Sequence, residues 1–491
     1  MVDVLLTHSY HLFYDRKQVR KMQPYPPLGT LYAAALLRQH GISVAVFDTM
    51  LNDPEQGFAA ALAHHRPQLV AIYEDNFNFL SKMCLARMRE VAFHIIRGAT
   101  AAGIPVVVNG SDSSDNAREY LQRGCECVLL GEAEHTLLEV AQALLGAYWP
   151  NWDRIPGIAF LRPPDGRIVR TTPRPLLRDL DSLPLPARDL VDLEPYRKAW
   201  KAGHGFFSLN LVSSRGCPYR CNWCAKPIYG NAFHIRSAES VAKEMKLLKE
   251  QCGAEHFWFA DDIFALKQSW AGELAASVER LDAAVPFKMQ SRVDLMTRPT
   301  VAALRRAGCA EVWMGAESGS QRILDAMDKD TRVEQIAAAR EHLLGHGIRA
   351  CYFLQFGYPG ETWEDIQKTV ELVRRTRPDD IGVSVSYPLP GTKFYGQVVE
   401  QLGTKTNWSD SDDLAVMFRG AYTDEFYHAL HDVLHAEVET WSHAAGTSPP
   451  VITEVRELWD RVHALEKTCR NQTRTTEARS GLMAPAAQFA D

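Results

Sequence analysis

The chain has 491 residues, 46% hydrophobic and 23% charged, so it can bury sizeable cores and is not an intrinsically disordered sequence. Its 54 Lys and Arg against 60 Asp and Glu leave a formal charge of -6, which provides no basic surface for nucleic acid. No apolar run reaches the roughly 18 residues of a membrane span, and the start lacks the basic-then-apolar pattern of an export signal. We therefore expect a cytoplasmic protein of about three domains, in which clustered cysteines bind metal rather than form disulfides.

The first 147 residues alternate apolar strands with helical stretches. The expected strands lie at residues 2–9, 42–49, 68–75, 104–110 and 126–132. Strands that are apolar along most of their length are typical of parallel sheets covered by helices on both faces. The pattern predicts an α/β domain with a doubly wound parallel sheet at residues 1–147.

Residues 148–205 interrupt this alternation and are rich in Pro and Arg. Residues 163–167 (PPDGR) predict a hairpin turn in a short antiparallel piece. Residues 181–190 are expected to be extended, because residues that precede proline disfavour the helical conformation. We predict a linker at 148–205 that contains this antiparallel piece.

A second series of strands and helices follows. Its strands are expected at residues 207–214, 256–262, 287–293, 311–318, 349–357 and 381–389. Six strands are too few for a closed eight-stranded barrel, so the series predicts a partial (β/α)6 barrel at residues 206–400. Residues 401–470 predict a mostly helical region, and residues 471–491 lack an apolar pattern and predict a disordered tail.

Three cysteines carry the strongest functional signal. Cys217, Cys221 and Cys224 have the spacing C-x3-C-x2-C and follow the first strand of the second series, at the end where α/β barrels place their active sites. A 4Fe–4S cluster usually takes four thiolates, so three leave one iron open for a ligand, which suits a catalytic cluster. The alternative is a zinc site with His234 as fourth ligand, although that spacing matches no common zinc finger. The other cysteines are scattered, as buried structural cysteines commonly are.

The cysteine motif resembles the signature of the radical S-adenosylmethionine enzymes. The resemblance implies that the three cysteines hold a 4Fe–4S cluster whose open iron chelates S-adenosylmethionine. An electron from a donor such as flavodoxin or ferredoxin would then cleave the sulfonium and give a 5′-deoxyadenosyl radical. The same family implies further cofactor contacts after later strands of the barrel: Ala260, Asp261, Asp262, Arg292, Glu317, Ser318, Gly357, Pro359 and Gly360. Each alone is also typical of a turn or helix cap, and only their order after the cysteines indicates the family.

The first domain resembles the cobalamin-binding domain that precedes the radical domain in one subset of that family. The resemblance rests on residues 24–41, 46–49, 106–112 and 129–140, and it places the corrinoid across the carboxyl ends of the strands. It implies contacts at Pro27, Leu28, Gly29, Asp48, Glu74, Asp75, Asn109, Gly110, Ser111, Gly131, Glu132 and Glu134. The chain lacks the D-x-H-x-x-G motif that supplies an axial histidine. Cobalt bound without histidine and a domain that keeps the fold without the corrinoid are the two interpretations.

With both cofactors, the resemblance implies methyl transfer to an unactivated carbon of a small-molecule or lipid-like substrate. One alternative is radical rearrangement, cyclisation or oxidation without net methyl transfer, and another is a non-catalytic corrinoid or iron–sulfur binding protein. His428, His431 and His435 share one face of an expected helix, and we predict that they serve packing rather than metal binding.

Overall fold

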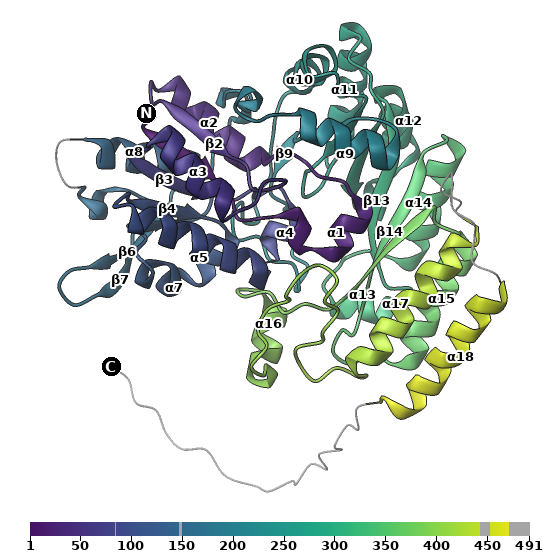
Figure 1. Cartoon of the computed structure of the whole chain (residues 1–491). Helices are drawn as coiled ribbons and strands as arrows, with labels where there is room; N and C mark the ends of the chain where they lie inside the picture. Colours follow the sequence, from purple (N-terminus) through teal and green to yellow (C-terminus); the bar gives the residue numbers. More distant parts are fainter. Residues whose placement is uncertain (84, 147–149, 442–451, 471–491) are drawn as a thin grey trace, which may run out of the picture.

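The computed structural model describes residues 1–83, 85–146, 150–441 and 452–470, and the expected tail at 471–491 lies outside this range. Two lobes lie side by side, one with the strands up to Arg170 and the other with the six-stranded sheet that begins at Ser208 (Figure 1). The first lobe contains a seven-stranded sheet in the order β2-β1-β3-β4-β5-β6-β7. Its strands are β1 (Val4–Thr7), β2 (Val44–Phe47), β3 (Leu69–Tyr73), β4 (Val106–Asn109), β5 (Cys127–Leu129), β6 (Ile158–Arg162) and β7 (Arg167–Arg170).

Strands β1 to β5 are parallel, and β6 and β7 are each antiparallel to the preceding strand. Helices α2 and α8 pack on one face, and α3, α5 and α7 pack on the other, which buries both faces as the apolar strands require. The helices of this lobe are α2 (Leu28–Gln39), α3 (Gln56–His65), α4 (Phe79–Lys82), α5 (Ala86–Ala101), α6 (Ser111–Asp115), α7 (Ala117–Gln122) and α8 (Glu134–Leu145). Strand β2 lies on one side of β1, and the chain then crosses to β3 on the other side. The topological switch point of the sheet therefore lies between β1 and β3.

The second lobe contains six parallel strands in the order β15-β14-β13-β12-β11-β8. They are β8 (Ser208–Leu211), β11 (His256–Phe259), β12 (Phe287–Ser291), β13 (Cys309–Glu317), β14 (Arg349–Phe356) and β15 (Asp380–Val385). The outer face packs against α10 (Ala238–Gln251), α11 (Gln268–Leu281), α12 (Arg298–Ala307), α14 (Val333–Gly345) and α15 (Trp363–Thr376). Alternate residues face these helices, as in β12, where Phe287, Met289 and Ser291 are buried and Lys288 and Gln290 are half-buried.

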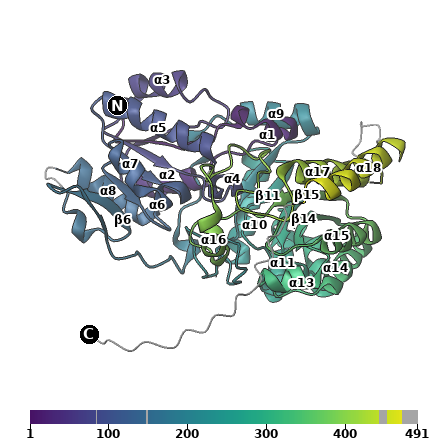
Figure 2. The same cartoon turned by 90° about the horizontal axis from the view of Figure 1, so that it is seen from below.

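Further helices complete the second lobe. They are α13 (Gln321–Ala326), α16 (Lys393–Val398), α17 (Asp424–Glu439) and α18 (Ile452–Thr468). Helix α17 packs beside β15, and α18 packs on α17. Seen from below, α17 and α18 lie at the end of this lobe farthest from the first sheet (Figure 2).

Two elements bind the lobes together. Helix α1 (Arg16–Lys21) leads into a segment that contacts the second lobe, where Tyr25 Oη lies 3.1 Å from Ser208 Oγ. Helix α9 (Glu194–His204) contacts the same segment, since Trp200 Nε1 donates to the carbonyl of Pro24 at 2.7 Å. The N-terminal segment therefore belongs structurally to both lobes.

The fold class predicted from the sequence is confirmed: a doubly wound α/β domain, a six-stranded partial barrel and a helical C-terminal region. The strand expected at 207–214 is split, because Ser214 and Arg215 leave the sheet and form β9, which pairs with β10 (His234–Ile235). The antiparallel pair within residues 148–205 extends the first sheet. No helix within the described ranges is both long and apolar enough to cross a membrane.

Candidate functional site

The three cysteines lie on a loop that we call the cysteine loop, residues 216–231, directly after β9. Asp261, fully buried at the end of β11, fixes the start of the loop by accepting hydrogen bonds from Ser213 Oγ at 2.6 Å and Ser214 Oγ at 2.5 Å. Gly216 has φ +79°, and a Cβ there would lie 2.3 Å from the carbonyl oxygen of Ala232, so only glycine fits. Burial raises the pKa of the Asp261 carboxyl to about 6. Asp261 thus supports the cysteine loop from below.

The side chain of Lys226 links the beginning and the end of the cysteine loop. Lys226 Nζ donates to the carbonyl of Cys217 at 3.0 Å, to Asn231 Oδ1 at 2.9 Å and to the carbonyl of Tyr219. The ammonium group therefore ties the first cysteine to the end of the loop. This leaves the thiols, rather than the backbone, as the groups free to bind a ligand.

The three thiols form no disulfide and are half-buried. Burial raises the pKa of Cys217 and raises that of Cys224 to about 12, so bound cations are needed to hold them as thiolates at neutral pH. Within the described part of the chain, no three His, Cys, Asp or Glu side chains gather closely enough to hold a single ion. In a 4Fe–4S cluster each thiolate binds a different iron. The three sulfurs can therefore ligate the cluster without converging on a single metal ion.

A buried ion pair lies beside the loop. Lys329 Nζ lies 2.7 Å from Glu317 Oε1 at the end of β13, and both side chains are buried. Although burial disfavours its charge, Glu317 and the nearby Cys221 raise the pKa of Lys329. Its ammonium lies 6.0 Å from the ring centre of Trp223, whose buried Nε1 has no partner among the described residues. This N–H, on a residue between Cys221 and Cys224, is available to donate a hydrogen bond to an acceptor atom of a ligand.

Arg292, expected to meet the S-adenosylmethionine carboxylate, lies beneath the loop. Its guanidinium stacks on the ring of Tyr219 with Cζ 3.7 Å from the ring centre. It donates to the carbonyls of Lys329 at 2.9 Å and Asp330 at 3.0 Å and to Asp294 Oδ1 at 2.9 Å. The carboxylate contact stays a prediction, and the observed contacts position the loop.

The strand end after β14 also reaches the cysteine loop. Tyr358 Oη donates to Asn222 Oδ1 at 3.0 Å, between the second and third cysteines. Gly357 donates its N–H to Glu361 Oε2 at 2.6 Å, and Arg322 Nη2 donates to the carbonyl of Gly360 at 2.8 Å. The predicted residues Ser318, Gly357, Pro359 and Gly360 therefore lie at the same barrel end as the cysteines. Ala260 is buried there too, and Asp262 lies near Cys217 and Cys224.

The residues expected to contact cobalamin all follow parallel strands of the first sheet or begin the next helix. Pro27, Leu28 and Gly29 begin α2, Asp48 follows β2, Glu74 and Asp75 follow β3, Asn109, Gly110 and Ser111 follow β4, and Gly131, Glu132 and Glu134 follow β5. Backbones are close here: a Cβ at Gly29 would lie 2.9 Å from the carbonyl oxygen of Glu74. Burial raises the pKa values of the Glu74 and Asp75 carboxyls. Their contacts with cobalamin remain predictions.

Several polar groups at this edge have no internal partner. Among the described residues, the buried Asn76 Oδ1, Ser81 Oγ and Ser111 Oγ accept or donate no hydrogen bond. Because unpaired buried polar atoms are costly, these atoms need a partner such as an ordered water or a polar group of a ligand. The amide-bearing rim of a corrin would supply such partners. Asp48 is different, since Tyr196 Oη donates to its Oδ2 at 2.5 Å and His8 Nε2 lies 2.8 Å from its Oδ1.

The two strand-end regions meet through a buried charge network. Arg215, two residues before Cys217, lies with Nη1 2.6 Å from Glu132 Oε1 and Nη2 2.8 Å from Glu134 Oε1. Three rings surround the guanidinium at 5.4 Å each, those of Tyr32, Phe77 and Tyr229. Although burial disfavours its charge, Glu134 and Glu132 raise the pKa of Arg215 well above its ordinary value. The carboxylates of Glu132 and Glu134 are thus already paired.

A second ion pair, between Lys82 of α4 and Asp262, crosses the junction of the two lobes. Helix α4 lies between the lobes in both views (Figures 1 and 2). Sequence reasoning assigned no role to Lys82, Arg215, Asn222 and Lys329. Arg215 and Asn222 lie in the stretch that contains the three cysteines, whereas Lys82 and Lys329 stand at no motif position of the resemblance. The arginine directly before the glycine and first cysteine was the one signal that could have been used.

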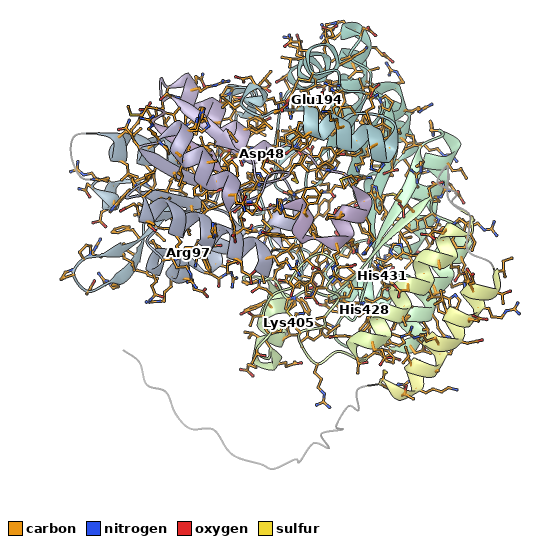
Figure 3. The ribbon with its side chains drawn as sticks, viewed as in Figure 1. Asp48, Arg97, Glu194, Lys405, His428 and His431 are labelled. Atoms are coloured by element: carbon orange, nitrogen blue, oxygen red, sulfur yellow. The ribbon has the colours of Figure 1, made fainter. Side chains whose placement is uncertain are left out.

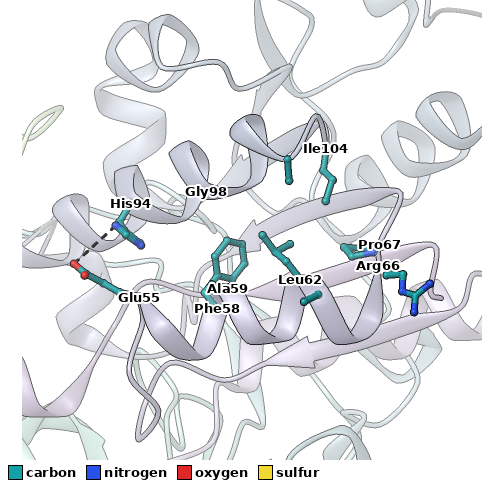
Figure 4. A pocket seen from close by; sticks show the side chains of 11 residues that line it. Glu55, Phe58, Ala59, Leu62, Arg66, Pro67, His94, Gly98 and Ile104 are labelled. Atoms are coloured by element: carbon teal, nitrogen blue, oxygen red, sulfur yellow. Dashed lines mark ion pairs between the residues drawn. The ribbon is translucent and has the colours of Figure 1, made fainter.

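Two other features lie apart from this site. An apolar groove between α3 and α5, of about 470 Å³, is lined by Phe58, Leu62 and Ile104, with a His94–Glu55 ion pair of 3.8 Å at one end (Figure 4). His428 and His431 lie on α17 (Figure 3), and the His431 and His435 rings are 4.4 Å apart. No metal-binding group includes these histidines within the described residues.

Two family models match the chain, "Radical SAM superfamily" over residues 211–373 and "B12 binding domain" over residues 22–141, together more than half of it. An uncharacterized methyltransferase of Pyrococcus horikoshii is 26% identical over 78% of this chain and 81% of its own length. The hopanoid C-3 methylase of Methylococcus capsulatus is 25% identical over 90% of this chain and 82% of its own. The solved structure of the radical S-adenosylmethionine methyltransferase TsrM of Kitasatospora setae, with cobalamin and a [4Fe-4S] cluster bound, has a TM-score of 0.67 at 21% identity, covering 82% of this chain and 78% of that one. The chain therefore belongs to the radical SAM superfamily and carries a B12 binding domain ahead of the radical SAM domain, so its cofactors are a 4Fe–4S cluster, S-adenosylmethionine and cobalamin.

Proposed function

We propose that this enzyme methylates an unactivated carbon of a small-molecule or lipid-like substrate. The observation that carries the proposal is the Arg215 network, which joins the loop after β5 to the residue two positions before Cys217. It brings the edge expected to bind cobalamin and the loop expected to hold the cluster to opposite sides of one junction. Methylation of an unactivated carbon requires this proximity, because the methyl donor and the radical source must both reach one substrate.

The proposal assigns distinct tasks to the chain's own residues. Cys217, Cys221 and Cys224 hold the cluster, while Lys226 fixes the backbone between them. When bound, the cluster and S-adenosylmethionine supply a 5′-deoxyadenosyl radical, and cobalamin supplies the methyl group. The buried Lys329–Glu317 pair fixes the Lys329 ammonium beside the cysteine loop, 6.0 Å from the ring centre of Trp223.

Relatives named for methyl transfer support methylation, and one of them, covered over most of both lengths, is named for methylation at a carbon, C-3 of a hopanoid. The Pyrococcus relative is also named a methyltransferase. The anaerobic magnesium-protoporphyrin IX monomethyl ester cyclase of Rubrivivax gelatinosus, 24% identical over 79% of this chain, keeps cyclisation as the alternative. A flavodoxin or ferredoxin is proposed as the electron donor.

Anaerobic turnover of the reconstituted enzyme with dithionite, S-adenosylmethionine and candidate substrate extracts tests the proposal. We expect 5′-deoxyadenosine and S-adenosylhomocysteine to form together, and a Cys217→Ala variant to form no 5′-deoxyadenosine. The matched control is Cys252→Ala, which alters a half-buried cysteine outside the loop. 5′-Deoxyadenosine without S-adenosylhomocysteine would replace methylation by rearrangement, cyclisation or oxidation, and formation of neither product would indicate a binding role.

A further inference from the structure

The inner face of the second sheet carries two stacked aromatic rings, which we call the aromatic shelf: Trp313 of β13 and Phe353 of β14. Their centres are 5.0 Å apart and their planes meet at 29°. Phe353 is 38% exposed, whereas Tyr352 and Leu354 on either side of it are fully buried against the helices. A phenylalanine in mid-strand with this exposure indicates an apolar surface that folding leaves uncovered.

Glycines stand on both sides of the shelf. Phe353 pairs with Gly315 of β13 and with Gly382 of β15. A Cβ at Gly382 would lie 3.2 Å from Cδ1 of Phe353 and 3.4 Å from Cζ3 of Trp313. Gly315 and Gly382 therefore place no side chain beside Phe353, and the ring surfaces that do not face each other stay accessible.

The shelf is held rigidly. Trp313 Nε1 donates to Glu311 Oε1 at 2.7 Å, and Arg349 Nη1 donates to Glu311 Oε2 at 2.7 Å. The carboxylate is fixed from both sides and in turn fixes the rotation of the indole. A surface ordered before binding loses little conformational entropy when a ligand lands on it.

A chain of contacts leads from the shelf to the cysteine loop. A Cβ at Gly315 would lie 2.6 Å from both Glu317 Oε1 and Lys329 Nζ. That ammonium lies 6.0 Å from the ring centre of Trp223, between Cys221 and Cys224. Glu317 stands four residues beyond Trp313, or about 13 Å along a strand, so the shelf lies deeper in the barrel than the predicted cluster.

We propose that the aromatic shelf binds a flat, unsaturated ring system of the substrate. The two rings cover each other's facing sides, so a ligand would extend the stack on an outer ring face, beside the glycines. Stacking of this kind is strongest for another π-system. A flexible alkyl chain would gain less, because it loses rotational freedom when it lies on a ring. The inference rests on the proposed function in one respect: the molecule that stacks on the shelf is taken to be the substrate that is methylated.

Binding of a probe to the full-length chain, measured by ligand-observed NMR without reductant, tests the shelf separately from turnover. The probes are 2-naphthalenemethanol and its saturated counterpart decahydro-2-naphthalenemethanol, which match in polar group and skeleton. We expect the flat probe to bind saturably and at least about tenfold more tightly, because stacking on an aromatic side chain contributes that much in other proteins. Trp313→Ala and Gly382→Val should each weaken the flat probe by a similar factor, and Trp313→Phe should retain most of the binding.

The controls separate the shelf from other surfaces and from the cofactor. Phe13→Ala removes a ring that is 53% exposed elsewhere and should change nothing. S-Adenosylhomocysteine should bind the shelf variants as tightly as the unaltered enzyme. If the two probes bind alike, if neither binds saturably, or if the variants bind the flat probe normally, the inference is wrong. Parallel loss of S-adenosylhomocysteine would also overturn it, since the shelf would then hold adenine. Gly382→Val, which removes no contact, decides the matter should Trp313→Ala not fold.

Discussion

Replacement of Arg215 by glutamine should disconnect the two lobes at the cofactor junction. The guanidinium lies 2.6 Å from Glu132 and 2.8 Å from Glu134, and the three side chains are only 3%, 7% and 4% exposed. Arg215→Gln leaves two carboxylates buried without a cation. Breaking a buried ion pair from one side typically costs about 3–5 kcal/mol. We expect a loss of this size in the free energy of unfolding.

The pH dependence of the loss has a definite sign. Burial raises the pKa of the Glu132 carboxyl and Arg215 opposes that rise, so loss of the guanidinium moves this pKa further above its unfolded value. The protonated form of Glu132 then stabilises the fold at low pH, and that stability disappears as the pH rises through the folded pKa. Arg215→Gln should therefore be closer to the unaltered enzyme at pH 5 than at pH 8. Adding Glu132→Gln and Glu134→Gln should recover most of the loss, because no buried charge then remains.

Urea unfolding of the full chain at both pH values, followed by tryptophan fluorescence, measures these differences. The matched control is Arg38→Gln, which breaks an exposed pair with Asp189 and should cost at most about 1 kcal/mol. Arg215→Lys should fall between, since an ammonium keeps the charge but lacks the planar fork. An Arg215→Gln loss no larger than that of Arg38→Gln, or one independent of pH, would refute the reasoning.

Three shorter predictions concern the cysteine loop and the barrel end. Alanine at all three loop cysteines should abolish the broad visible absorbance of the reconstituted cluster, while Cys252→Ala should keep it; persistence in the triple variant would contradict the cluster assignment. Gly216→Ala should prevent cluster assembly, because its Cβ would meet the Ala232 carbonyl at 2.3 Å, whereas Gly230→Ala, with no atom within 4 Å, should still assemble it; equal iron content would disprove the steric argument. Burial raises the pKa of Glu361 to about 8, above its unfolded value, so its stabilising contribution is lost as the pH rises toward 8; Glu361→Gln should flatten this decline in urea unfolding between pH 5 and pH 8, and parallel curves would refute it.

The sheets were predictable because their strands are short, mostly apolar runs separated by helices of suitable length. Between β3 and β4 the chain forms two helices, α4 and α5, with residue 84 outside the described ranges. The split of the strand at 207–214 was not predictable, because it depends on Asp261, 47 residues later, binding Ser214. Local sequence patterns carry no information about such a distant partner.

The candidate site divides in the same way. The cysteines were predictable from their spacing, which reflects the geometry of one cluster. Lys329 was not, because its role comes from tertiary contact with Glu317 and Trp223. Asp261 and Asp262 look equivalent in sequence, yet Asp261 is fully buried beneath the loop and Asp262 pairs with Lys82 across the junction. Adjacent residues near a strand end can differ in this way because the backbone sends their side chains in different directions.

The segment between the lobes also determines how the enzyme can work. Arg188 donates to Asn210 Oδ1 at 3.3 Å at the start of the barrel, and Tyr196 donates to Asp48 Oδ2 at 2.5 Å in the first lobe. Both arginine and tyrosine side chains are buried, so the connection holds the lobes rather than letting them swing. Because the Arg215 network fixes the same junction from the other side, the separation between the two predicted cofactor surfaces is set by folding. Substrate must then enter a space whose two sides are already positioned by folding, with the aromatic shelf on the barrel side.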